Sequence, residues 1–218
     1  KVIDPCMGSG HILVYAFEVL MQIYESYGYS RRDAAKSIIE NNLYGLDIDK
    51  RAYQLAYFAV MMKARQYNRR ILNCEIKLHV YAIQESNEVD CDFEVKGWSK
   101  AVKDTMHYVI SVFKDAKEYG SILNVEQRDY QAALRALDDF ERNCELTLEN
   151  HLKLQQLPFL KLLLSQAAVM AQKYNVVVTN PPYMGSSNMG CKLLEFVKNN
   201  YPDSKADLFA VFIEKCYK

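Results

Sequence analysis

Short apolar runs alternate with helical patterns at the start of the chain, and this alternation limits the possible folds more than any other feature of the sequence. The runs have the character of buried strands and lie at Val2-Ile3, at residues 43–46 and at residues 76–83. Apolar residues at helical spacing fill the intervals, over residues 11–27, 30–41 and 50–68. Strands that alternate with helices in this way pair in parallel through right-handed crossovers. The sequence therefore predicts an α/β fold with a parallel, doubly wound sheet flanked by helices.

A long helical segment then interrupts the alternation. Residues 98–173 show no strand pattern, only helical periodicity with breaks near Gly120 and at Pro158. We interpret residues 97–174 as a helical insertion that forms a hairpin over the sheet, with a dedicated recognition module as the alternative.

The strand pattern returns at residues 175–179, where we expect the β-branched side chains of Val176, Val177 and Val178 to be buried. Helices are predicted over residues 189–200 and from Ser204 to Lys218. Residues 1–96 and 175–218 would then be the two parts of the sheet domain, separated by the insertion. Because the chain opens in a strand pattern without Met and stops within a helical one, we expect a truncated sheet and a longer parent polypeptide.

Charge and cysteine usage restrict the possible partners. Lys and Arg together number 27, and Asp and Glu also number 27, whereas an independent DNA-binding domain usually has a basic excess. The apolar runs are too short to span a bilayer. The six cysteines are scattered without a Cys-x-x-Cys pair, at Cys6, Cys74, Cys91, Cys144, Cys191 and Cys216. We therefore expect a cytoplasmic protein with free thiols, no metal site and no membrane contact.

The first strand runs into a glycine-containing turn, Asp4-Pro5-Cys6-Met7-Gly8-Ser9-Gly10, which precedes a helix. Glycine allows the backbone to approach a ligand closely, and the free N–H groups of a helix N-terminus attract an anionic group. The later glycine of the dinucleotide fingerprint is missing, which disfavours a pyrophosphate ligand. A tight strand-to-helix turn with no ligand is the alternative reading.

The second motif is an acidic residue at the end of the second strand, in Gly45-Leu46-Asp47-Ile48-Asp49. An acidic side chain at this point can accept hydrogen bonds from both hydroxyls of a ribose. We assign that role to Asp47 and expect Asp49 to cap the following helix.

The third motif, Asn180-Pro181-Pro182-Tyr183, follows the last strand and carries the most specific signal. The two prolines remove two N–H donors, so the loop presents acceptors: the side-chain oxygen of Asn180 and the carbonyl of Pro181. Such acceptors suit a planar amino group. When both of its hydrogens donate hydrogen bonds, the nitrogen lone pair becomes more available for attack. Tyr183 offers a flat face on which a base can stack. The alternative is a purely structural role, as a proline-rich strand end with a packed tyrosine.

Together the three motifs resemble the Rossmann-fold amino-methyltransferases, whose catalytic loop is (Asn/Asp/Ser)-Pro-Pro-(Tyr/Phe/Trp). The order of the motifs is similar to that of the DNA adenine-N6 branch. Residues 45–49, Arg51-Ala52, residues 82–86 and the helical insertion resemble the adenine-specific methyltransferases of bacteriophage-exclusion (BREX) defence systems. The resemblance implies S-adenosylmethionine as cofactor and adenine in double-stranded DNA as substrate. It also implies phage-defence or restriction-modification subunits as possible partners.

The resemblance also implies further binding residues. Asp4, Pro5, Cys6, Gly8 and Gly10 would surround the methionine part of the cofactor. Ile48 would pack on its adenine ring, and Gln84 or Glu85 would contact the adenine amino group, although the family often has Asp there. Phe209, in Lys205-Ala206-Asp207-Leu208-Phe209, would line the cofactor and target pocket or belong to the core.

By this analogy the target base is flipped out of the duplex and stacks on Tyr183 while Asn180 and Pro181 orient its amino group. Methylation of a protein glutamine or an RNA base would use the same acceptors, although such enzymes usually have a shorter path between the motifs. A catalytically inert, cofactor-binding assembly module is a third possibility, and a nicotinamide oxidoreductase a distant fourth. We also expect the isolated chain to bind DNA weakly and to self-associate through an unpaired sheet edge.

Overall fold

The computed structural model describes residues 1–89, 93–145 and 147–217, and the chain forms two compact units. The first unit contains Lys1–Ile83, Glu118–Ile122 and Lys173–Lys218, and the second contains Gln84–Lys117 and Leu123–Gln172. Residues 118–122 therefore belong to the unit with the sheet, although they lie within the segment expected to form the helical insertion.

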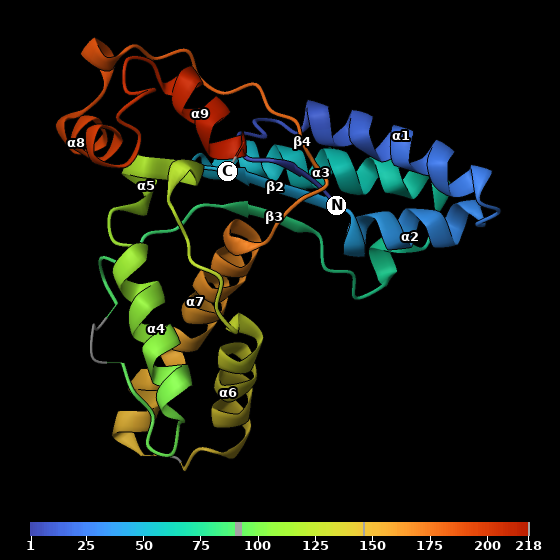
Figure 1. The fold of residues 1–218 in the computed structure, drawn as a ribbon. Coiled ribbons are helices and arrows are strands. Elements are labelled where there is room, and N and C mark those ends of the chain that lie inside the picture. The colour runs from blue at the N-terminus through green and yellow to red at the C-terminus, as the bar shows by residue number, and fades with distance from the viewer. Residues whose placement is uncertain (90–92, 146, 218) are drawn as a thin grey trace. The chain divides into compact units, whose positions relative to one another are not determined.

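A parallel sheet of four strands forms the centre of the first unit, in the order β3-β2-β1-β4 (Figure 1). The strands are β1 (Val2–Asp4), β2 (Leu43–Asp47), β3 (His79–Ala82) and β4 (Val176–Val177). Ile3 is in register with Tyr44 on one side and with Val177 on the other. The predicted α/β fold with a parallel sheet is confirmed. The strand order reverses between β1 and β4, and ligands of such sheets bind at the carboxyl ends of the strands beside that reversal.

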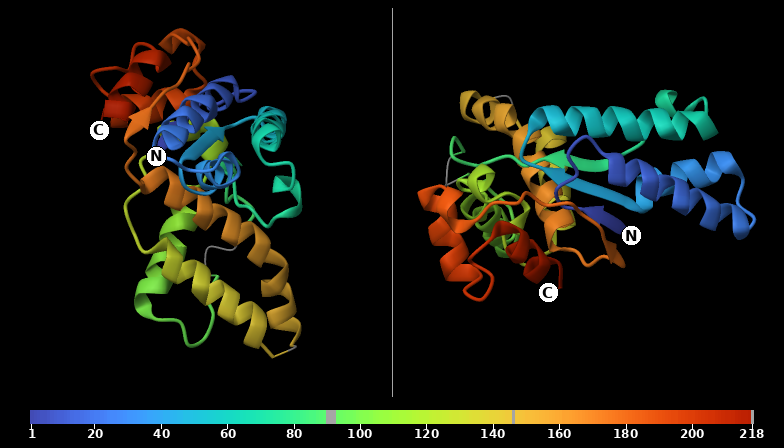
Figure 2. Two further views of the ribbon diagram at one scale, coloured as in Figure 1. Left: turned by 90° about the vertical axis from the view of Figure 1, so that its right-hand side faces the viewer. Right: turned by 90° about the horizontal axis from the view of Figure 1, so that it is seen from above.

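Three helices pack on this sheet and on one another, and α1 and α3 run side by side (Figure 2). They are α1 (His11–Ser26), α2 (Arg31–Asn41) and α3 (Lys50–Tyr67), and the short helix η1 (Ile71–Asn73) follows them. Leu13 and Phe17 on α1 are fully buried together with Leu43 and Val80 of the sheet. The helical spacing of apolar residues thus supplies the buried face of α1.

Local features of the sequence form the C-terminal end of α1 and the N-terminal end of α3. Gly28 has φ +83° after α1, and the N–H of Tyr29 donates to the carbonyl of Tyr24 (3.1 Å). The rings of Tyr24 and Tyr29 meet edge to face, which completes a Schellman motif. The side chain of Asp49 accepts a hydrogen bond from the N–H of Arg51 (2.7 Å), as expected for the cap of α3.

A second apolar core in the first unit joins the segments around the Asn180-Pro181-Pro182-Tyr183 loop. It contains residues of η2 (Gly120–Ile122), α8 (Cys191–Asn200) and α9 (Leu208–Tyr217), and η3 (Ser186–Asn188) precedes α8. Ile122, Val197 and Val211 are fully buried, and Cys6 packs against the cluster. This core therefore ties the glycine-containing turn to the chain that follows β4.

The second unit is helical in its described residues. Its helices α4 (Lys100–Val112), α6 (Tyr130–Asn143) and α7 (Leu148–Ala171) pack against one another, and α5 (Ala116–Tyr119) links the two units in sequence (Figure 1). The predicted break at Pro158 is wrong, because α7 continues through this residue. Leu157, Leu160 and Leu164 of α7 are buried, and this packing outweighs the hydrogen bond that proline cannot make.

The predicted burial of Val176, Val177 and Val178 is also wrong. Their exposed fractions are 47%, 36% and 43%. In the described structure β4 pairs only with β1, so it lies at an edge of the sheet and one side of its backbone faces outward.

The cysteines of the described residues are free thiols. Cys6, Cys74, Cys144, Cys191 and Cys216 are free, while Cys91 and Lys218 lie outside the described residues. Within the described ranges, no helix combines the length and the apolar character needed to cross a membrane.

Candidate active site

Asp4 lies at the carboxyl end of β1, and its side chain is almost completely buried, with 1% exposed. One carboxylate oxygen, Oδ1, accepts hydrogen bonds from the N–H of Cys6 (3.0 Å) and the hydroxyl of Thr179 (2.7 Å). The other oxygen, Oδ2, is buried with no partner among the described residues. Burial raises the pKa of Asp4, opposed by these two hydrogen bonds and assisted by the nearby Asp47 carboxylate. A buried acceptor in this state fits a site that receives a hydrogen-bond donor or a cation.

The glycine-containing turn is fastened to the end of β2. The N–H of Gly8 donates to Oδ2 of Asp47 (2.9 Å), and the N–H of Met7 donates to the carbonyl of Leu46 (3.0 Å). Gly10 precedes α1 with φ +86°, and a Cβ there would lie 2.8 Å from the backbone Cα of Ala56. The glycine is therefore required by close helix packing as well as by its backbone conformation. It has no side chain to cap α1, so the first N–H groups of the helix stay available at the turn.

The carboxylate of Asp47 accepts two backbone hydrogen bonds and has further acceptor positions for a ligand. Its Oδ2 accepts from Gly8, and its Oδ1 accepts from the N–H of Asp49 (2.9 Å). A carboxylate has about four acceptor positions, so two remain for hydroxyl donors. The neighbouring Ile48 is 56% exposed, and a Cβ on Gly120 would lie 3.1 Å from its side chain. An acceptor and an apolar side chain thus stand next to each other at the end of β2.

The loop Asn180-Pro181-Pro182-Tyr183 leaves β4 beside Asp4. The N–H of Val178 donates to the carbonyl of Ile3 (3.0 Å), and Thr179 then binds the Asp4 carboxylate. Asn180 is exposed, Pro181 is buried and Tyr183 is 76% exposed. The structure therefore brings together the first and third motifs, which are far apart in the sequence.

Phe209, at the start of α9, stacks on Tyr183. Their ring centroids are 5.2 Å apart, and the ring planes differ by 14°. The two segments that carry the rings are paired, because Gly185 and Asp207 form an antiparallel bridge. Phe209 therefore lies beside the Asn180-Pro181-Pro182-Tyr183 loop, and the sequence did not predict its contact with Tyr183.

Two hydroxyl side chains with structural roles at the site were missed. Thr179 links the ends of β1 and β4 through Asp4, and its position next to Asn180 at a strand end is the signal that could have identified it. Ser121, in η2, donates to the carbonyl of Pro5 (2.6 Å). No local pattern marks Ser121, because only the tertiary fold brings η2 to the turn.

Three residues predicted to bind the cofactor make contacts within their own unit: Cys6, Gln84 and Glu85. Burial raises the pKa of the Cys6 thiol to about 12, which favours the neutral thiol at neutral pH. Gln84 and Glu85 belong to the second unit. There the N–H of Gln84 donates to Oε1 of Gln166 (3.1 Å), and Glu85 pairs with Lys117 (3.8 Å).

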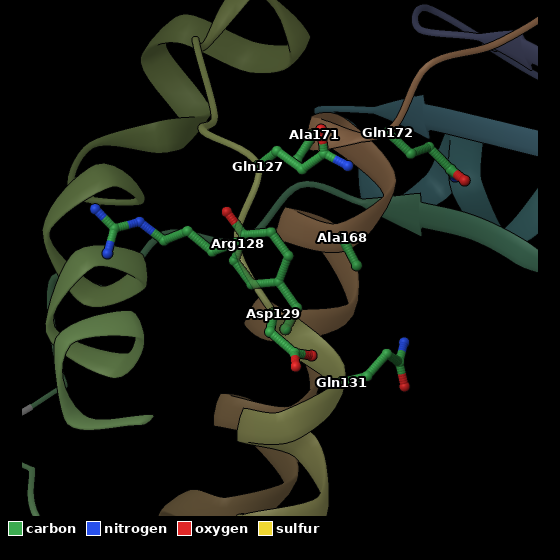
Figure 3. Close-up of a pocket in the computed structure, with 8 residues that line it drawn as sticks. Gln127, Arg128, Asp129, Gln131, Ala168, Ala171 and Gln172 are labelled. Carbon is green, nitrogen blue, oxygen red and sulfur yellow. The ribbon is translucent and has the colours of Figure 1, made fainter. Parts of the chain in front are cut away.

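The second unit contains hollows of its own. One of about 230 Å³ lies between the start of α6 and the carboxyl end of α7, where Asp129 and Gln172 are among the lining residues (Figure 3). It is smaller than the roughly 300–1,000 Å³ of typical ligand pockets. An open hollow of about 860 Å³ lies near Trp98 and Phe140. Neither hollow is lined by a residue that the sequence predicted for the site.

Comparisons with known proteins give a matching family and similar relatives. Residues 41–218 match the family described as Eco57I restriction-modification methylase. The chain is 43% identical over 98% of its length to "Adenine-specific methyltransferase PglX" of Lacticaseibacillus casei (strain Zhang), and 39% identical over its whole length to "Adenine-specific methyltransferase BrxX" of Escherichia coli O9:H4 (strain HS). It covers 18% and 20% of these two relatives, so it spans about a fifth of their length.

Proposed function

The chain belongs to the Eco57I restriction-modification methylase family, and on that premise we propose that it transfers a methyl group from S-adenosylmethionine to the N6 amino group of adenine in DNA. The observation that carries the proposal is the hydrogen bond between Thr179 and Asp4, which holds the Asn180 loop beside the glycine-containing turn. A methyl donor bound at the turn and an amino group bound at the loop would then be neighbours.

The cofactor fits the residues at the ends of β1 and β2. The unpartnered Oδ2 of Asp4 suits the α-ammonium group of S-adenosylmethionine, and the uncapped N-terminus of α1 suits its carboxylate. The free acceptor positions of Asp47 suit the ribose hydroxyls, and the exposed Ile48 suits the adenine ring. Pro5, Cys6, Gly8 and Gly10 would shape the turn, and Gln84 or Glu85 is proposed for the adenine amino group. When bound, the cofactor supplies an electrophilic methyl group on a positively charged sulfur.

The residues of the loop would prepare the adenine for attack. The side-chain oxygen of Asn180 and the carbonyl of Pro181 would each accept one hydrogen of the amino group, while Pro182 removes a competing donor. Tyr183 is exposed and would stack on the flipped base. Alignment of the amino nitrogen with the methyl group would supply much of the rate.

Double-stranded DNA is the proposed substrate of the whole protein. The names of the two relatives specify adenine, which favours a base over a protein glutamine as substrate. Because the chain is electrically neutral and spans about a fifth of those relatives, we place the main phosphate contacts in other parts of the polypeptide. A role in restriction-modification follows the family description, and the resemblance to BREX methyltransferases extends the proposal to phage defence, with subunits of such a system as partners.

The exposed edge of β4 supports a further part of the proposal. Its two valines and the following Val178 are partly exposed, and the edge can accept a strand from another chain. We therefore expect the isolated chain to self-associate, and sedimentation velocity over a range of concentrations tests this. The free cysteines fit a reducing cytoplasm.

The central test is Asn180→Ala in the complete polypeptide that carries this chain. We expect methyl transfer to DNA to be lost while the Kd for S-adenosylmethionine changes less than about threefold, since the removed group acts mainly in the transition state. Mass spectrometry of N6-methyladenine in DNA and calorimetry with the cofactor measure the two quantities. Asn200→Ala, at the end of α8, is the matched control and should leave both unchanged. N6-methyladenine at the wild-type level in the Asn180→Ala protein would show that the catalytic assignment is wrong.

A second variant separates the cofactor site from the catalytic loop. Asp47→Ala should abolish cofactor binding in calorimetry, because the ribose would lose its acceptor and the turn would lose the bond to Gly8. Wild-type affinity in this variant would exclude the proposed ribose contact.

A further inference from the structure

Tyr183 and Phe209 form an aromatic pair beside an isolated antiparallel bridge that joins their two segments. The N–H of Leu208 donates to the carbonyl of Met184 (2.9 Å), and the N–H of Ser186 donates to the carbonyl of Ala206 (2.9 Å). These two bonds flank the antiparallel bridge between Gly185 and Asp207. Tyr183 lies two residues before Gly185, and Phe209 lies two residues after Asp207. The two rings therefore meet next to the bridge.

The pair leaves one face of the tyrosine ring open. Phe209 lies against Tyr183 in a nearly parallel, offset arrangement, with the planes inclined by 14°. Tyr183 nevertheless has 76% of its surface exposed, whereas Phe209 has 36% exposed. The phenylalanine therefore covers one side of the tyrosine and leaves the other side to solvent.

We propose that Phe209 is a positioning residue that backs Tyr183, so that the two rings form a platform on which the flipped adenine stacks. This inference rests on the proposed function, because it assigns a role in base binding within the same site. It also replaces the direct contact with the cofactor that the sequence indicated for Phe209. A single exposed tyrosine would change rotamer freely, whereas a ring stacked on a neighbour is held in one orientation before the base arrives.

The backbone argues against a role for Phe209 as a plug that the base must displace. The bridge fixes the chain immediately next to both rings, on Met184 and on Leu208. The side chain of Asp207 also accepts a hydrogen bond from the N–H of Phe209 (2.8 Å), which fixes the start of α9. These bonds hold the backbone of both segments in place, and a base can reach the open face of Tyr183 without moving either segment.

The test uses the complete polypeptide with tritiated S-adenosylmethionine and adenine-unmethylated genomic DNA. Phe209→Leu should lower kcat about threefold to tenfold, while calorimetry gives an unchanged Kd for the cofactor. Phe209→Tyr, which keeps a stacking ring, should restore most of the activity. In a Tyr183→Leu background, which itself lowers kcat by about tenfold or more, Phe209→Leu should add less than about a twofold further loss.

Each other outcome has a definite meaning. An equal loss of turnover and cofactor affinity in Phe209→Leu would return the residue to the cofactor pocket and overturn the inference. Increased turnover would identify a plug, unchanged turnover would make the stack incidental, and fully additive losses would separate Phe209 from Tyr183. Failure of the proposed function is distinguishable, because the wild-type protein would then produce no N6-methyladenine. Circular dichroism melts of the variants confirm that they are folded.

Discussion

Removal of the hydroxyl of Thr179 tests whether one hydrogen bond joins the two halves of the site. Thr179→Val keeps the branched shape of the side chain and deletes the donor to Oδ1 of Asp4. A hydrogen bond to a charged group contributes about 1.5–3 kcal/mol. The loss should be near the upper part of this range because Asp4 is buried and its other oxygen has no partner among the described residues. Thr179→Ser retains the hydroxyl and is the matched control.

The loss of stability expected for Thr179→Val depends on pH. Burial raises the pKa of Asp4, and the Thr179 hydrogen bond opposes that rise, so the valine variant should raise the pKa further. The added destabilisation is therefore largest at pH values above the folded-state pKa of Asp4, where the carboxylate is ionised, and shrinks as the pH falls through that pKa.

Urea denaturation of the chain, followed by circular dichroism at about pH 7 and about pH 4, measures this difference. With a loss of about 2.5 kcal/mol and a urea dependence of about 2–3 kcal/mol per molar, the midpoint should fall by roughly 1 M at neutral pH. The serine variant should stay within about 0.3 M of the wild type. Equal falls of the midpoint in Thr179→Val and Thr179→Ser would contradict this reasoning. The same effect of Thr179→Val at both pH values would also show that a hydrogen bond to the ionised Asp4 does not link the two segments.

Three further predictions concern the glycine-containing turn. Asp4→Asn should raise the melting temperature at neutral pH, and the gain should shrink toward acid, because burial raises the pKa of Asp4 and the wild type regains stability as its carboxyl is protonated; calorimetry should also show weaker cofactor binding, and an unchanged melting temperature at neutral pH would contradict this reasoning. Gly10→Ala should destabilise the chain by about 2–4 kcal/mol in urea titrations, since the added Cβ would meet the backbone of Ala56 at 2.8 Å with φ +86°, and a loss below about 1 kcal/mol would refute this close packing. In native protein Cys6 should react with a maleimide far more slowly than the exposed Cys191, because the pKa of Cys6 is raised to about 12; equal labelling rates before unfolding would show that the turn is open.

Local patterns in the sequence determined the elements and the family. Period-3.6 spacing, Gly28 after α1 and Asp49 before α3 set the helices and their ends, since caps act on hydrogen bonds within a few residues. The alternation of strands and helices determined the parallel sheet. The resemblance to adenine-specific methyltransferases, carried by short motifs, is confirmed by the comparisons. The roles of the individual site residues stay predictions.

The tertiary structure decided what depends on contacts between distant segments. Val176 and its neighbours read as buried because β-branched runs usually are, yet the position of β4 at the sheet edge leaves them partly exposed. α7 continues through Pro158 because its leucines are buried in the second unit, an energy that local helix propensity does not contain. The bond from Thr179 to Asp4 and the stack of Phe209 on Tyr183 likewise arise only when the reversal of strand order brings β4 beside β1 and when α9 pairs with the loop. Sequence periodicity records which side of an element is apolar, whereas strand order and register determine which side chains meet.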